Sequence, residues 1–222
     1  VTATYILLKG FKRLGANVDT YIPDRVEDGY GIHDHLIKKA MEDGIDTIVT
    51  CDNGISASSQ ITYAKELGMT VVVTDHHEVP FTDTEEGRTY ILPPADAIIN
   101  PKQADCTYPN KNICGAVVAM KLIFALYEKY RLPEEEKEDF LEPAAIATVG
   151  DIMDLQGENR KGGTCPSAFY QKQRPESADP GHRPGRPENH LLRHWIPSWP
   201  LHQCQRQTGY RNALPGTFAV GG

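Results

Sequence analysis

Short apolar runs that alternate with helix-length segments constrain the fold of this chain more than any other feature. The apolar runs lie at residues 47–50, 71–73 and 97–99, with a β-rich run at 18–22 before them. Helical spacing marks residues 6–14, 35–41, 57–67 and 116–130, and a further helix is expected over 134–149. This alternation predicts an α/β fold, in which a parallel sheet is flanked by helices on both faces.

Composition excludes several classes of protein. No run of 18 apolar residues occurs, so we expect no membrane span and no membrane partner. The five cysteines have no paired short spacing, which argues against a zinc ribbon or a disulfide framework and favours a cytoplasmic location. The net charge of −7 argues against a generally basic nucleic-acid-binding surface, although bound divalent cations can supply positive charge locally.

The composition changes sharply near Arg160. Residues 1–160 carry a net charge of −12, whereas 161–222 carry +5 and hold eight of the 16 prolines. Leu, Ile, Val and Phe total only eight in that second part, too few for a core. We therefore expect a folded domain at 1–160 and a disordered or frameshifted tail at 161–222.

Two of the predicted strands end in groups that can bind metal. Asp52 follows the run at 47–50, and Asp75-His76-His77 follows the run at 71–73. Ligands of parallel sheets sit outside the carboxyl ends of the strands, so these groups are expected at one edge. Carboxylate with imidazole suits Mn²⁺, Fe²⁺, Co²⁺ or Zn²⁺, whereas a purely carboxylate site favours Mg²⁺. The alternative is that Asp52 caps a helix and the histidines are surface loop residues.

Asp151 is a further candidate ligand. It closes an apolar helix, where a carboxylate interacts unfavourably with the helix dipole. A purely structural residue at that position is more often Lys or Gly, so the sequence favours a functional role for Asp151.

Several spaced motifs in order resemble the RecJ family of DHH phosphoesterases. They lie at residues 29–31, 51–57, 74–78, 99–102, 108–109, 114–116 and 150–151, followed by 158–160. The resemblance covers about residues 1–160 and implies a DHH-type domain. It also implies metal-dependent 5′→3′ exonuclease activity on single-stranded DNA in recombination and repair, with two Mn²⁺ or Mg²⁺ ions.

The resemblance also implies roles for individual residues. Asp52 matches the second family motif, Asp75-His76-His77 the third and Asp151 the fourth, so all five are candidate catalytic and metal-binding residues. Asp75 could instead orient a ligand by hydrogen bonding. Arg25 is a candidate phosphate contact, or equally a solvated loop arginine.

The chain departs from the family pattern at both ends. The first motif, an Asp-x-Asp-x-Asp-Gly-like run, is expected just before Val1 and does not occur. The family's second core domain and OB-fold module are also expected downstream and do not occur. We therefore expect this fragment to bind metal poorly and to have little or no activity.

A frameshift would explain the tail. Reading the codons of residues 194–209 one nucleotide later permits I-G-F-x-L-G-P-C-I-N-A-S-G-R-L, which resembles the family's downstream segment. The rival interpretation is a disordered basic DNA-binding tail. The coding DNA distinguishes the two.

Two other functions remain open from the sequence. Within the same family, the chain could be an oligoribonuclease, a cyclic-dinucleotide phosphodiesterase or a pyrophosphatase. A different class is an inactive binding module. The sequence predicts no particular protein partner.

Overall fold

A computed structural model describes residues 1–23, 31–85, 87–163 and 217–221. Its helices are α1 (Thr2–Arg13), α2 (Asp34–Glu42), α3 (Ser58–Glu66), α4 (Gly115–Lys129), η1 (Glu134–Phe140, a 3₁₀-helix), α5 (Leu141–Gly150) and α6 (Gly157–Gly163). Its strands are β1 (Asn17–Tyr21), β2 (Thr47–Cys51), β3 (Thr70–Thr74), β4 (Phe81–Thr84), β5 (Gly87–Tyr90), β6 (Ala97–Ile99) and β7 (Thr217–Gly221).

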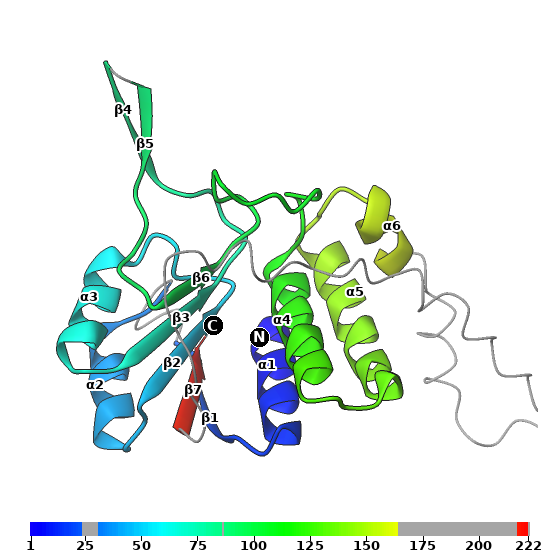
Figure 1. The fold of residues 1–222 in the computed structure, drawn as a ribbon, viewed down its shortest axis with the longest axis horizontal. Coiled ribbons are helices and arrows are strands. Elements are labelled where there is room, and N and C mark those ends of the chain that lie inside the picture. The colour runs from blue at the N-terminus through cyan, green and yellow to red at the C-terminus, as the bar shows by residue number, and fades with distance from the viewer. Residues whose placement is uncertain (24–30, 86, 164–216, 222) are drawn as a thin grey trace, which may run out of the picture.

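The central feature is a five-stranded parallel sheet with the strand order β1-β7-β2-β3-β6. Helices α2 and α3 lie against one face, and α1 and α4 lie against the other, with α5 packed on α4 and α1 (Figure 1). The predicted α/β fold, a parallel sheet flanked by helices, is therefore confirmed.

Each central strand contributes to two hydrophobic cores. In β2, Ile48 packs into the core under α2 and α3, whereas Val49 packs into the core under α1 and α4. In β3, Val71 and Val73 face the first of these cores, and Val72 faces the second. Alternating side chains of a strand point to opposite faces, so a strand covered on both faces is apolar throughout. This is why the strands read as continuous apolar runs.

The helix expected over 134–149 is two elements, and that prediction was wrong in detail. The chain forms the 3₁₀-helix η1 up to Phe140 and then begins α5 at Leu141. Pro143 has no backbone N–H, and in a helix interior its ring clashes with the carbonyl four residues earlier. In α5 it lies in the first turn, where neither effect disrupts the helix.

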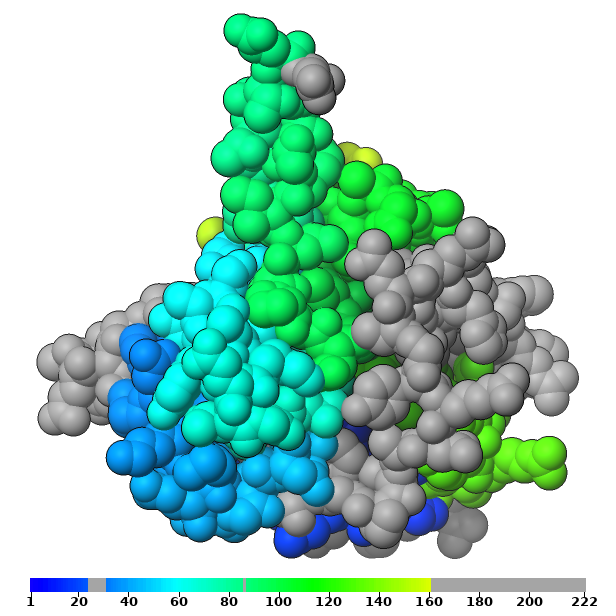
Figure 2. Space-filling model, turned by 60° about the vertical axis from the view of Figure 1, so that its left-hand side comes forward, coloured from blue at the N-terminus to red at the C-terminus, as the bar shows by residue number. Residues whose placement is uncertain are grey.

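The β4–β5 hairpin was not predicted. It is antiparallel, every residue of its two strands is exposed, and it projects from the body of the molecule (Figures 1 and 2). Phe81 and Tyr90 pair edge to face across it, with ring centroids 6.2 Å apart. Its sequence is mostly polar, so it lacks the apolar runs by which the other strands are recognised.

The predicted tail lies mainly outside the described residues, which resume at β7. That strand pairs in parallel with β1 on one side and β2 on the other, so this part of the expected disordered segment is placed within the sheet. Helix α6 also runs across the expected boundary at residue 160. Within the described part of the chain, no helix is long and apolar enough to cross a membrane.

Candidate metal centre

Asp52 lies directly after β2, in a backbone conformation that few residues adopt. Its φ is 63°, in the left-handed region, which asparagine and aspartate tolerate better than most residues. Its backbone N–H donates to the carbonyl of Thr74, 2.9 Å away, so the position is tied to the end of β3. Two residues later, Gly54 has a φ of 108°, a conformation that glycine adopts readily and that turns the chain after the strand.

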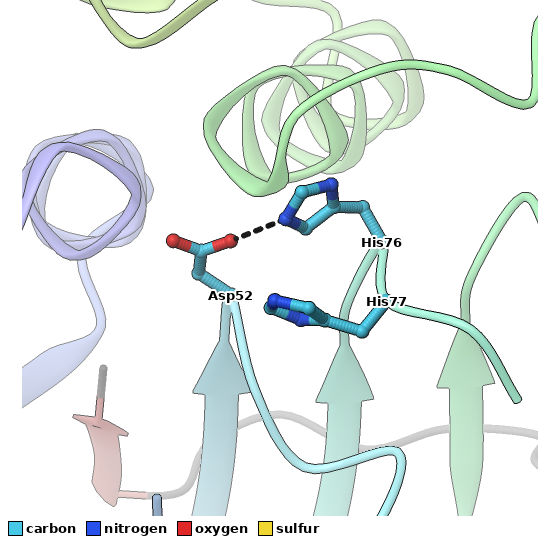
Figure 3. A group of neighbouring side chains, drawn as sticks. All are labelled: Asp52, His76 and His77. Atoms are coloured by element: carbon cyan, nitrogen blue, oxygen red, sulfur yellow. Dashed lines mark ion pairs between the residues drawn. The ribbon is translucent and has the colours of Figure 1, made fainter. Parts of the chain in front are cut away.

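His76 and His77 follow β3 and face Asp52 (Figure 3). Nε2 of His76 lies 3.0 Å from Oδ1 of Asp52, and the two imidazole rings have centroids 4.4 Å apart. One possible ligand atom from each of Asp52, His76 and His77 lies within 4.8 Å of the others. The two strand ends therefore meet at one sheet edge, as the sequence predicts.

Asp75 lies behind this group rather than in it. Its side chain is 1% exposed. One oxygen accepts from the backbone N–H of Ile55 at 3.0 Å, and the other accepts from those of His76 and His77 at 2.7 and 3.2 Å. The buried carboxylate thus joins the loop after β2 to the loop after β3.

Asp75 also orients His77. Nδ1 of His77 lies 2.7 Å from Oδ1 of Asp75. Because the carboxylate can only accept, the proton sits on Nδ1 and the lone pair on Nε2 is free to bind a cation. Of the two roles open to Asp75 from the sequence, these contacts favour the orienting one.

Asn100 is a supporting residue whose role was not predicted from the sequence. It follows β6, is 1% exposed, and its side-chain amide donates to the carbonyl of His77 at 2.9 Å. Its side-chain oxygen accepts from the backbone N–H of Lys102 at 2.8 Å. The available signal was its position as a polar residue directly after a third parallel strand. Asp52 and Asp75 were predicted as site residues from the same kind of position.

Asp151 is the C-cap of α5 and lies outside the three-residue group, but its charge acts on the same place. Asp151 is exposed to solvent, yet partial desolvation of its carboxyl raises its pKa, and the negative charge of Asp52 raises it further, whereas His76 and His77 lower it. The net shift is upward, so the folded chain without a cation holds two carboxylates that repel one another.

The charge of His76 reflects the same neighbours. Burial lowers the pKa of His76, but its close contact with the Asp52 carboxylate and the charge of that carboxylate raise it, and the charges of Asp75 and Asp151 raise it as well. The net shift is upward, so without a cation the imidazole binds a proton more readily than a free histidine does. A proton at His76 therefore substitutes for a cation beside the carboxylates.

The residues present fit a divalent cation. Oδ1 of Asp52 is buried, and among the described residues no aligned hydrogen-bond donor reaches it, although His76 lies close by. A buried acceptor of this kind normally has a partner. One carboxylate with two imidazoles is a donor set for Mn²⁺, Fe²⁺, Co²⁺ or Zn²⁺ rather than for Mg²⁺. The sixth proposed site residue, Arg25, lies outside the described residues.

Replacing Asp151 by Asn should stabilise the cation-free protein. A raised folded-state pKa means that stability falls as pH rises from the ordinary value of 3.8 through the folded-state pKa. Above that window the ionised group carries the full penalty, which Asn removes. Because Asp151 is exposed and screened, we expect a gain below about 1 kcal/mol at neutral pH. Urea unfolding in EDTA at pH 7 and pH 3 measures it. A gain of equal size at both pH values would contradict the account.

Comparisons with known proteins agree with this geometry. The model of the DHH family, N-terminal domain, matches residues 1–148. The single-stranded-DNA-specific exonuclease RecJ of Bacillus subtilis is 42% identical over 160 residues, which is 72% of this chain and 18% of that protein. RecJ of Escherichia coli is 36% identical over 169 residues, covering 72% of this chain and 28% of that protein.

Two solved structures are also similar. A crystal structure of exonuclease RecJ bound to manganese has a TM-score of 0.61 at 32% identity, over 75% of this chain and 40% of that one. RecJ from Thermus thermophilus in complex with Mn²⁺ has a TM-score of 0.55 at 30% identity, over 72% of this chain and 21% of that one. The chain spans less than a third of the length of the curated relatives named above. On the family match over residues 1–148, together with the strand-end Asp and His residues, this chain belongs to the DHH family.

Proposed function

We propose that this chain carries part of the metal site of a single-strand-specific DNA exonuclease that hydrolyses phosphodiester bonds with Mn²⁺. The observation that carries the proposal is the convergence of Asp52, His76 and His77 at the carboxyl edge of the sheet. The two relatives described above are named single-stranded-DNA-specific exonucleases, and the two similar solved structures contain manganese.

Three residues would hold the cation. Asp52 offers a carboxylate oxygen, and His76 and His77 each offer Nε2. A divalent cation bound there supplies positive charge to a phosphate and lowers the pKa of a bound water. The two imidazole donors favour Mn²⁺ over Mg²⁺, because Mg²⁺ prefers oxygen ligands.

The remaining site residues act on the ligands or on the electrostatic field. Asp75 fixes the tautomer and orientation of His77, and Asn100 holds the carbonyl of the same residue. Asp151 adds negative charge, which strengthens cation binding and lowers the stability of the cation-free chain. A chain with a net charge of −7 repels DNA, so a bound cation would also help the phosphate backbone to approach.

A chimeric enzyme tests this proposal. Residues 1–160 would replace the matching segment of the Bacillus subtilis relative, which supplies the rest of the enzyme. We expect the chimera with Mn²⁺ to degrade single-stranded DNA in preference to duplex DNA, dinucleotides and pyrophosphate. His76→Ala should reduce this activity by roughly 100-fold or more, because it removes a metal ligand.

His35→Ala in the same chimera is the matched control, since His35 is an exposed histidine on α2. It should leave the activity unchanged. Preferential cleavage of dinucleotides would favour the oligoribonuclease alternative. Full activity in the His76→Ala chimera would contradict the proposed metal site.

A further inference from the structure

Gly115 is the first residue of α4, and its backbone does not require glycine. The positive-φ glycines of the described chain do not include Gly115. Alanine is a better helix former than glycine, so a helix start alone would favour a side chain here. Another constraint must explain the glycine.

That constraint is the space taken by Asp52. A Cβ atom built on Gly115 would lie 2.6 Å from Cγ and 2.8 Å from Cβ of Asp52, and closer still to its Oδ1. These are the three nearest atoms, and approaches below 3.0 Å are essentially never seen for real Cβ atoms. Residues 52 and 115 therefore cannot both carry a side chain in this arrangement.

Asp52 has little freedom to move aside as a whole. Its left-handed φ of 63° and its N–H bond to Thr74 fix its backbone against the end of β3. Two residues later, a Cβ built on Gly54 would lie 2.6 Å from Oγ1 of Thr50, so that turn is closely packed as well. Any side chain at 115 must then turn the carboxylate away from His76 or displace the start of α4.

We propose that Gly115 is a positioning residue for the metal site. Its missing side chain leaves room for the Asp52 carboxylate to face His76, in the position from which it binds a cation. The metal-binding part of this inference rests on the proposed function.

The first test measures Mn²⁺ binding by calorimetry on the whole 222-residue chain. We expect Gly115→Ala to weaken Mn²⁺ binding by about tenfold or more. Gly150→Ala should leave the Mn²⁺ affinity unchanged, because a Cβ atom at residue 150 meets nothing within 4 Å. Gly10→Ala should lower stability without changing Mn²⁺ affinity, since a Cβ there would lie 2.6 Å from Ile123 in the core. Unchanged Mn²⁺ affinity in Gly115→Ala would overturn the proposal.

The second test needs no metal and follows the melting temperature in EDTA. Gly115→Ala should lower it by roughly 3 to 10 °C in the unaltered chain. In an Asp52→Gly background the clash is gone and glycine suits the left-handed φ, so Gly115→Ala should cause no loss. An equal loss in both backgrounds would overturn the positioning role. If the unaltered chain binds no Mn²⁺ even at millimolar concentration, the proposed metal site is contradicted, and the comparison of the two backgrounds still decides the role of Gly115.

Discussion

Replacing Asp75 by Ala lowers the free energy of unfolding by about 3–5 kcal/mol, the range seen when one partner of a buried charged network is removed. The carboxylate is 1% exposed and accepts from three backbone N–H groups and from the imidazole of His77. Alanine leaves these donors without a partner, in a place where few water molecules can replace the carboxylate. Urea unfolding in EDTA measures the loss.

A matched aspartate provides the control. Asp83 pairs with Arg88 on the exposed hairpin at 3.2 Å, and its side chain is 69% exposed. Asp83→Ala should change stability by less than about 1 kcal/mol, because exposed ion pairs contribute little. If Asp75→Ala and Asp83→Ala have the same small effect, Asp75 does not organise the two loops.

Replacing Asp52 by Asn lowers Mn²⁺ affinity by roughly 100-fold or more, because it removes the only carboxylate of the three-residue group. The same change should not lower the stability of the cation-free chain. Asparagine tolerates the left-handed φ of 63° and keeps the size of the side chain. It also removes the charge that raises the pKa of Asp151.

Calorimetry with Mn²⁺ and melting in EDTA, on the same Asp52→Asn protein, separate the two effects. A metal ligand shows a large loss of affinity with no loss of stability. An aspartate with a purely structural role shows the reverse; a helix cap is not that role, because Ala57 is the N-cap of α3 and no side chain caps it. Loss of both would indicate that Asp52 holds the loop rather than a cation.

The sequence predicted the parts of the fold that depend on apolar periodicity. The runs at 47–50, 71–73 and 97–99 are β2, β3 and β6, because each strand is covered on one or both faces. The break at Leu141 could have been predicted from Pro143, since proline belongs in the first turn of a helix. The β4–β5 hairpin could not, because its exposed residues carry no burial pattern.

The sequence also predicted which residues meet at the site, because parallel strands end at one edge. It could not assign their separate roles. Asp75 and His76 are adjacent in the chain, yet their side chains lie in different places. The Asp75 carboxylate is buried against Ile55, 20 positions away, whereas the His76 imidazole faces Asp52. The role of Gly115 depends on a contact with Asp52, which is distant in the sequence. Such contacts follow from how α4 packs on the sheet, which local pattern does not encode.

Anomalous diffraction from a crystal of this chain soaked in Mn²⁺ tests the central claim most directly. The account predicts a manganese peak at bonding distance from a carboxylate oxygen of Asp52 and from Nε2 of His76 and His77, with Asp75 still bonded to Nδ1 of His77. A peak bound by Asp75 instead, or no peak at this sheet edge while Mn²⁺ binds elsewhere, would contradict it.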